Sequence, residues 1–364
     1  VFLFSLTVIS CKSSDDDDLT SSTSSTSSTG LFVTVGDNGI MLTSSDGISW
    51  TKRTSVTTNN LYGVTYGNST FVTVGDNGTI LTSSDNGTSW TNKRTSSGTT
   101  NNLYGVTYGN STFVTVGDNG TILTSSDGTS WTNKRTSSGT SEHLYEVTYG
   151  NGLFVTVGDN ATILTSSDGT TWTNTSTNKR TTLGRYFSQP DANHLYGVTY
   201  GDGLFVTVGG DATILTSSDG TTWTERDGLR SKWALPKYLK GVTYRKKLFV
   251  TVGRNGLILN SSDGTTWTER KSGTKYNLVG ITYANGLFVG VGKNGQIVTS
   301  FDGNWWVKRT YVLPTWLNGV TYGNGTFVTV GDNGIMLTSS DGISWTKRTS
   351  VTTNSLSAVT YSNH

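Results

Sequence analysis

The sequence contains little cysteine, histidine, proline or charge. One cysteine in 364 residues excludes a disulfide framework and a zinc site built from several cysteines. The three histidines, His143, His194 and His364, leave little for a metal centre, so we expect neither a metal nor another cofactor. Only 14% of the residues are charged, and 27 basic residues nearly balance 25 acidic ones. This balance gives no global reason to expect a nucleic-acid partner.

Glycine and aromatic residues are abundant instead. The chain holds 45 glycines and 11 tryptophans, with many serines and threonines. Helices favour alanine, leucine, glutamate and lysine, so this composition argues against a helical protein.

The first ten residues form an apolar run that is too short to span a membrane and has the character of a secretory signal core. The run ends at the sequence Val-Ile-Ser-Cys, residues 8–11, which resembles the lipobox of bacterial lipoproteins. This resemblance implies that residues 1–11 are a lipoprotein signal segment and that Cys11 is lipidated. A buried cysteine in a core is the alternative interpretation.

Residues 12–29 have the composition of a linker. Lys12 and the acidic run 15–18 follow the cysteine directly and resemble the export signal of surface lipoproteins in Bacteroidota. We therefore expect a bacterial outer-membrane lipoprotein displayed on the cell surface, with a periplasm-facing lipoprotein as the alternative. The serine and threonine residues up to position 29 cannot bury a core. Membrane contact is expected through the lipid anchor alone.

Residues 30–364 consist of a repeat. A Val-Gly pair recurs eight times, at separations of 39 to 51 residues, and its glycines are Gly36, Gly75, Gly117, Gly158, Gly209, Gly253, Gly292 and Gly331. Periods near 40 residues with several short strands are typical of propeller blades. In the second unit we expect four strands, at residues 61–66, 71–74, 79–83 and 90–94, joined by short turns that demand antiparallel neighbours.

The chain ends indicate how the ring closes. The first unit lacks a Val-Thr-Tyr strand, whereas residues 356–361 supply one with no unit after it. We therefore predict an all-β, eight-bladed propeller of four-stranded antiparallel blades, closed by the C-terminal strand pairing with the N-terminal blade. Seven blades and a stray unit would leave strand edges exposed. We expect a monomer.

The turn after the third strand carries a recurrent motif. In the second unit, Ser-Ser-Asp-Asn-Gly-Thr-Ser-Trp resembles the Asp-box of bacterial-neuraminidase-type repeats, and the other units are one residue shorter. A carboxylate that accepts turn N–H groups suggests a structural role. The resemblance implies that these turns lie opposite the ligand-binding face; their aspartates are Asp46, Asp85, Asp127, Asp168, Asp219, Asp263, Asp302 and Asp341.

The resemblance says little about function, because propellers with this motif include sialidases, other hydrolases, assembly factors and receptors. The chain has only four glutamates and no arginine-isoleucine-proline signature of sialidases. Eight equivalent aspartates would also require eight active sites. We therefore favour a non-catalytic binding or adhesion module for a glycan or protein. A carbohydrate-active hydrolase and an assembly factor for a membrane complex are the alternatives.

Departures from the repeat indicate where a ligand would bind. Residues 226–254 hold nine basic residues against one acidic residue, and several loops carry aromatics. Basic and aromatic residues together suit an acidic glycan, a protein or a lipid head group. Relaxed surface loops that cap neighbouring blades are the alternative. The candidate ligand-binding residues are Arg185, Tyr186, Lys232, Trp233, Lys237, Tyr238, Arg254, Lys293 and Trp316.

Overall fold

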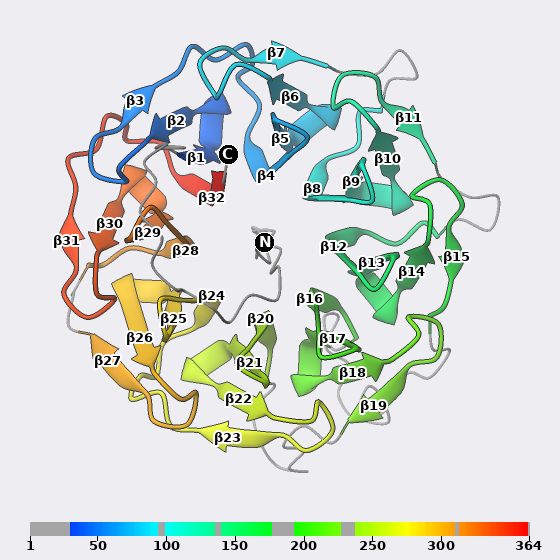
Figure 1. The fold of residues 1–364 in the computed structure, drawn as a ribbon, viewed down its shortest axis with the longest axis vertical. Coiled ribbons are helices and arrows are strands. Elements are labelled where there is room, and N and C mark those ends of the chain that lie inside the picture. The colour runs from blue at the N-terminus through cyan, green and yellow to red at the C-terminus, as the bar shows by residue number, and fades with distance from the viewer. Residues whose placement is uncertain are drawn as a thin grey trace, which may run out of the picture.

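The computed structural model describes residues 30–93, 99–134, 140–176, 193–226, 237–309 and 313–362. These residues form eight four-stranded antiparallel sheets arranged as a ring around a central axis (Figure 1). The predicted eight-bladed, all-β propeller is therefore confirmed. Within these ranges, no helix has the length and apolar character needed to cross a bilayer.

Each blade runs from an inner strand beside the axis to a short outer strand at the rim (Figure 1). In blades 2 to 8 and then blade 1, the inner strands are β4 (Leu61–Gly67), β8 (Leu103–Gly109), β12 (Leu144–Gly150), β16 (Leu195–Gly201), β20 (Leu239–Arg245), β24 (Leu278–Ala284), β28 (Leu317–Gly323) and β32 (Leu356–Ser362). In blades 1 to 8, the second strands are β1 (Leu31–Gly36), β5 (Thr70–Gly75), β9 (Thr112–Gly117), β13 (Leu153–Gly158), β17 (Leu204–Gly209), β21 (Leu248–Gly253), β25 (Leu287–Gly292) and β29 (Thr326–Gly331).

The two outer strands of each blade are shorter. In blades 1 to 8, the third strands are β2 (Met41–Ser44), β6 (Ile80–Ser83), β10 (Ile122–Ser125), β14 (Ile163–Ser166), β18 (Ile214–Ser217), β22 (Ile258–Ser261), β26 (Gln296–Ser300) and β30 (Met336–Ser339). The fourth strands are β3 (Thr51–Lys52), β7 (Thr91–Asn92), β11 (Thr132–Asn133), β15 (Thr173–Asn174), β19 (Thr224–Arg226), β23 (Thr268–Arg270), β27 (Val307–Arg309) and β31 (Thr346–Lys347).

The predicted start of the fourth strand at residue 90 was wrong. Strand β7 begins at Thr91, because Trp90 belongs to the preceding turn and its indole Nε1 donates a hydrogen bond to the carbonyl of Gly87 at 3.2 Å. The ladder therefore starts only after the tryptophan.

The C-terminal strand completes the first blade, as predicted. Strand β32 pairs antiparallel with β1, and their register runs from Leu31 opposite Ser362 to Val35 opposite Ala358. The Thr34 hydroxyl also donates a hydrogen bond to the carbonyl of Ala358 at 2.8 Å. Each edge of β1 is thus paired, because β2 occupies its other side.

The hydrophobic core lies between neighbouring blades. One cluster joins Val72 and Val74 of blade 2 to Leu103, Phe113 and Trp131 of blade 3, and the other clusters repeat this arrangement. Because blades cover both faces of each sheet, second strands such as β5 are buried along their whole length. This burial explains why Phe-Val-Thr-Val replaces strict polar–apolar alternation.

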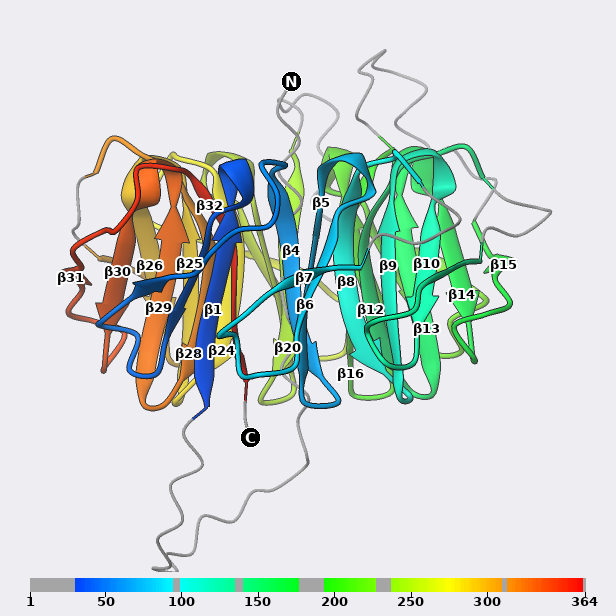
Figure 2. The same cartoon turned by 90° about the horizontal axis from the view of Figure 1, so that it is seen from above.

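The ring has two faces, which we call upper and lower as they lie in Figure 2. The upper face carries the 3-10 turns between second and third strands: η1 (Asp37–Gly39), η2 (Asp76–Gly78), η3 (Asp118–Gly120), η4 (Asp159–Ala161), η5 (Gly210–Ala212), η6 (Arg254–Gly256), η7 (Lys293–Gly295) and η8 (Asp332–Gly334).

Loops that lead into the next inner strand share the upper face with these turns. The amide of Gly120 in η3, for example, donates to the carbonyl of Glu142 at 2.8 Å. The turns between third and fourth strands lie on the lower face, where a Cβ added to Gly87 would meet Leu31 Cδ2 at 2.9 Å. The described chain therefore starts on the lower face.

Candidate binding site on the upper face

The first residue of the 3-10 turn divides the upper face by charge. Five successive blades, from blade 8 through blade 1 to blade 4, carry aspartate there, whereas blade 5 carries glycine and blades 6 and 7 carry Arg254 and Lys293. Burial raises the pKa of Asp37, and repulsion from Asp332 and Asp76 in the adjacent turns raises it further. Neighbouring turns are therefore close enough for their charges to interact.

Four tyrosines curve around the axis beside the acidic turns, and we call them the tyrosine arc. They are the second residues of four successive inner strands: Tyr62, Tyr104, Tyr145 and Tyr196. Successive ring centroids lie 5.7, 6.0 and 5.8 Å apart. The ladder shifts register at this residue, as between Leu61 and Gly63, so a β-bulge places each tyrosine at the inner edge.

The arc fixes the acidic turns through its hydroxyl groups. The hydroxyl oxygens of Tyr62 and Tyr104 donate hydrogen bonds at 2.8 Å to the carboxylates of Asp76 and Asp118, respectively. Tyr145 does the same to Asp159 at 2.5 Å. Burial and the neighbouring carboxylate raise the pKa of each of these tyrosines, so all three remain protonated donors at neutral pH.

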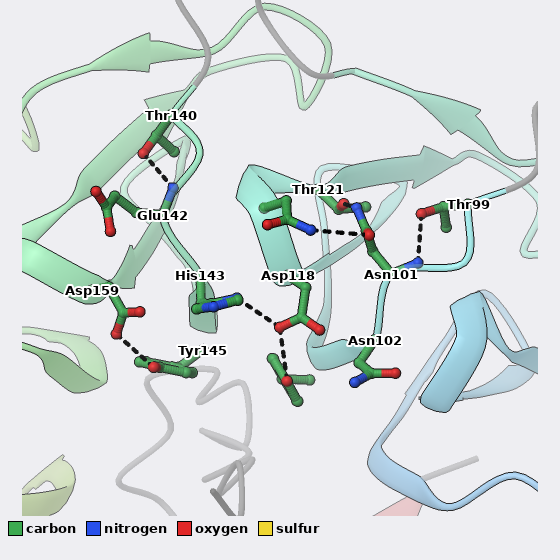
Figure 3. A network of polar contacts seen from close by, with 12 residues as sticks. Thr99, Asn101, Asn102, Asp118, Thr121, Thr140, Glu142, His143, Tyr145 and Asp159 are labelled. Carbon is green, nitrogen blue, oxygen red and sulfur yellow. Dashed lines mark hydrogen bonds and ion pairs between the residues drawn. The ribbon is translucent and has the colours of Figure 1, made fainter.

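Two histidines extend this network on blades 3 to 5, and Figure 3 shows the contact that His143 makes with Asp118. Nδ1 of His143 lies 2.7 Å from the Asp118 carboxylate that also accepts the Tyr104 hydroxyl. Nδ1 of His194 contacts Asp159 in the same way, and its ring is stacked near Tyr196 with an interplanar angle of 10°. Each carboxylate thus accepts a tyrosine hydroxyl and also contacts a histidine ring.

The other half of the upper face presents cations on aromatic rings. The Lys240 ammonium lies 3.1 Å from the Tyr196 ring centroid, at the end of the arc. The Arg254 guanidinium lies 5.6 Å from the Tyr238 ring, and the Lys293 ammonium lies 5.6 Å from the Trp316 ring. Such contacts hold a cation in place while leaving part of its surface available.

Five of the nine predicted ligand-binding residues therefore lie on the upper face. The structure brings Tyr238 against Arg254 and Trp316 against Lys293, while the ammonium of Lys237 forms an ion pair with Glu269 at 3.1 Å. Their role in binding stays a prediction. The remaining residues predicted to act, Cys11, Arg185, Tyr186, Lys232 and Trp233, lie outside the described residues.

The lower-face aspartates have a different environment. In blade 3, Asp127 Oδ1 accepts the amides of Thr129 and Ser130 at 2.7 and 2.9 Å, and the Ser125 hydroxyl at 2.9 Å. The backbone hydrogen bond from Ser130 is the largest cause that lowers the pKa of Asp127. Equivalent turns occur around Asp46, Asp85, Asp168, Asp219, Asp263, Asp302 and Asp341.

Sequence reasoning missed the tyrosine arc and one buried acid. Glu146 occupies the inner-strand position that holds glycine in six other blades, and only 4% of it is exposed. Its Oε2 has no hydrogen-bond partner among the described residues, and burial raises its pKa well above the usual range. The second and third residues of the inner strand carried this signal, because they vary within a Leu-Tyr-Gly-Val-Thr-Tyr segment whose other positions are constant except for Ile281.

The described ranges contain no group of three His, Cys, Asp or Glu residues placed to hold a metal ion. The expectation of no metal therefore stays a prediction, since other residues lie outside these ranges.

Comparison with solved structures shows the fold alone. The computationally designed Ika8 protein aligns with a TM-score of 0.59 at 10% identity, covering 88% of this chain and 96% of that one. YCF48 from Cyanidioschyzon merolae aligns with a TM-score of 0.54 at 15% identity, covering 74% and 91%. A structure described as YCF48 bound to D1 peptide aligns with a TM-score of 0.57 at 16% identity, covering 77% and 93%.

Comparison with the curated proteins gives no match. The family model described as the DUF6242 beta propeller domain matches residues 106–216 and 188–317, which together span more than half of the chain. Blades 3 to 7 lie largely within this stretch. The chain therefore belongs to the DUF6242 β-propeller domain family.

Proposed function

We propose that this protein is a non-catalytic binding module that holds a glycan or protein ligand against its upper face. The observation that carries the proposal is the asymmetry of this face, where the tyrosine arc of blades 2 to 5 meets the ring-supported cations of blades 6 and 7. A structural role alone would favour the same residues in every blade.

The chemistry of this face suits recognition. Tyrosine and arginine are enriched among the residues that dominate binding energy, because they combine a large apolar surface with a polar group. Arg254 and Lys293 are exposed and rest on rings, so they are available to an anionic group without a large loss of side-chain freedom.

Hydrolysis is less well supported than binding. A glycosidase needs one carboxyl group that can donate a proton and a second that acts as base or nucleophile. On this face, Asp76, Asp118 and Asp159 each accept a tyrosine hydroxyl, and the last two also contact histidine. These contacts favour fixed hydrogen-bond acceptors over a catalytic pair.

A protein segment is one reasonable ligand class. YCF48, which shares the fold at 16% identity, has been solved bound to D1 peptide. This likeness supports the idea that a propeller of this shape accepts a peptide, but a glycan chain would satisfy the same aromatic and charged groups.

We also propose that the module is carried on a bacterial outer-membrane lipoprotein at the cell surface, anchored through Cys11. The proposal rests on the apolar run before this cysteine and the acidic run after it. Expression of a Cys11→Ala variant with its full signal should move the protein from the membrane fraction to soluble material. Retention in the detergent-soluble fraction would contradict lipidation.

The binding proposal can be tested with the full chain on an array of glycans and peptides, beside a glycosidase screen. A Tyr238→Ala and Arg254→Ala double variant should weaken any bound ligand by at least about tenfold, a change of 1.4 kcal/mol. The lower-face variant Asp127→Asn is the control, and it should bind like the wild type. Equal binding by the double variant, or turnover of a glycoside, would contradict the proposal.

A further inference from the structure

Blade 7 departs from the repeat on the lower face, away from the proposed ligand site. Its turn between β26 and β27 exposes 62% of Phe301 and 82% of Trp305, and 49% of Val307 is exposed where β27 begins. In the other seven blades, serine occupies the position of Phe301, serine or threonine that of Trp305, and threonine that of Val307. Three positions that are polar in the other blades are thus apolar in this turn and at the start of β27.

The fold of the blade does not require these side chains. The structural tryptophan of this turn is Trp306, which is buried, donates its Nε1 hydrogen bond to the carbonyl of Gly303 at 3.0 Å and packs 6.2 Å from Phe288. Trp305 contributes only its backbone amide, which donates to Asp302 at 3.0 Å. Its indole therefore presents an apolar surface to the surroundings of the protein.

Lysines flank this apolar surface. Lys246 and Lys247, both exposed, form the turn between β20 and β21 of blade 6, and Lys308 is exposed beside Val307. The two turns are neighbours, because a Cβ added to Gly303 would lie 2.3 Å from Leu248 Cδ2. We call Phe301, Trp305, Val307 and these three lysines the blade 7 patch.

The backbone of the lysine turn is unfavourable for lysine. Lys246 and Lys247 have φ values of 50° and 56°, in the left-handed region, where the other described turns of this kind carry Asn-Ser, Asn-Gly or Asp-Gly. Asparagine and glycine adopt this region more readily than lysine does. Both lysines therefore occupy this turn at a conformational cost.

We propose that the blade 7 patch docks on an anionic lipid surface, a membrane contact in addition to the lipid anchor that the sequence alone led us to expect. Tryptophan and phenylalanine partition into the interface between head groups and acyl chains, and neighbouring lysines attract anionic head groups. Three apolar side chains offer much less contact area than a stable protein interface needs. The described chain also starts on this lower face, next to Leu31, so docking would place the upper face away from the membrane.

Vesicle sedimentation of the full chain carrying Cys11→Ala tests this inference without any contribution from a lipid anchor. The protein should bind vesicles of equal parts phosphatidylglycerol and phosphatidylcholine, and bind weakly to phosphatidylcholine alone. The triple variant Phe301→Ser, Trp305→Ser, Val307→Thr restores residues that other blades use, so it should fold, and its partitioning should fall by at least about tenfold. Ile343→Thr, in the corresponding turn of blade 8, is the matched control and should bind unchanged.

A second variant separates binding from folding. Lys246→Asn with Lys247→Gly should raise the melting temperature, because it relieves the left-handed turn, and should weaken binding to the anionic vesicles about threefold or more. Undiminished sedimentation of the triple variant would overturn the inference. Self-association through the patch in place of vesicle binding would also overturn it. Analytical ultracentrifugation would then show a dimer of the parent protein, and the triple variant would be a monomer.

Discussion

The upper and lower faces of the ring are formed by turns of the same eight repeats, but they tolerate sequence change differently. On the lower face, the aspartate side chain itself accepts the turn amides, as Asp127 accepts those of Thr129 and Ser130. On the upper face, the turn amide is held by backbone, since Asp76 and Arg254 donate to the carbonyls of Asn60 and Tyr238. Upper-face side chains can therefore vary without loss of the turn, and this freedom allows a binding surface.

The largest expected effect on stability comes from opening the ring, because this disturbs both faces at once. Removal of residues 355–364 takes away β32, which buries Leu356 and Val359 and places Tyr361 4.6 Å from Phe32. We expect a loss of about 5 kcal/mol or more in the free energy of unfolding, with aggregation through the exposed edge of β1. Thermal denaturation measures the loss, and removal of residues 363–364 alone is the control. An unchanged melting temperature would mean that the ring closes in another way.

Blade 3 carries one aspartate on each face, Asp118 on the upper and Asp127 on the lower, so the two faces can be compared within one blade. Asp127→Ala removes an acceptor of two backbone amides and should cost about 2 kcal/mol. Asp118→Ala removes the acceptor of the Tyr104 hydroxyl and the contact with His143, and it should cost about 1 kcal/mol or less, because the amide at position 118 still donates to the carbonyl of Asn102. Urea denaturation of both variants provides the measurement. Equal costs would show that the upper-face carboxylate is structural too.

Measuring stability against pH tests whether the buried Glu146 carboxyl group is protonated in the folded protein. Burial raises the pKa of Glu146, so the folded state favours the protonated acid. The contribution of this carboxyl group to the free energy of unfolding is therefore fully present below its unfolded pKa of about 4.3. It is lost as the pH rises toward and through its folded pKa. Glu146→Ala should therefore be about 2 kcal/mol more stable than the wild type at pH 8, with the difference shrinking toward pH 4.

The control for this titration is Glu269→Ala, which removes an exposed carboxylate of the outer strand β23. Its stability relative to the wild type should not grow between pH 4 and pH 8. A Glu146→Ala difference that is constant over this range would contradict a buried, protonated acid.

The smallest expected effect on stability concerns the basic half of the upper face. Arg254 is exposed, and its guanidinium lies over the Tyr238 ring. Arg254→Ala should change the free energy of unfolding by about 0.5 kcal/mol or less, because an exposed cation–π contact is weak. Differential scanning calorimetry checks this value. A loss as large as that of Asp127→Ala would remove the distinction between the faces.

The fold was accessible from sequence because each repeat carries its own turn residues and its own tryptophan. Ring closure was also accessible, since the first unit lacks the inner strand that residues 356–361 supply. The start of the fourth strand was not accessible from sequence, because the Trp90 indole donates its hydrogen bond within its own turn and the residue does not join the ladder. The basic and aromatic residues of blades 6 and 7 stand out in the sequence as departures from the repeat, but the contact of Arg254 with the Tyr238 ring depends on the tertiary structure.

The sequence by itself determined the number of blades, their strand order and the turns that join them, because these depend on local residue patterns repeated eight times. Only the tertiary structure decided what becomes adjacent across blades. Tyr62, Tyr104 and Tyr145 are about forty residues apart in the chain, but ring curvature brings equivalent positions of successive blades within 6.0 Å. Each blade contributes one residue to such a surface. Which side chains become neighbours therefore depends on how the blades are packed around the ring.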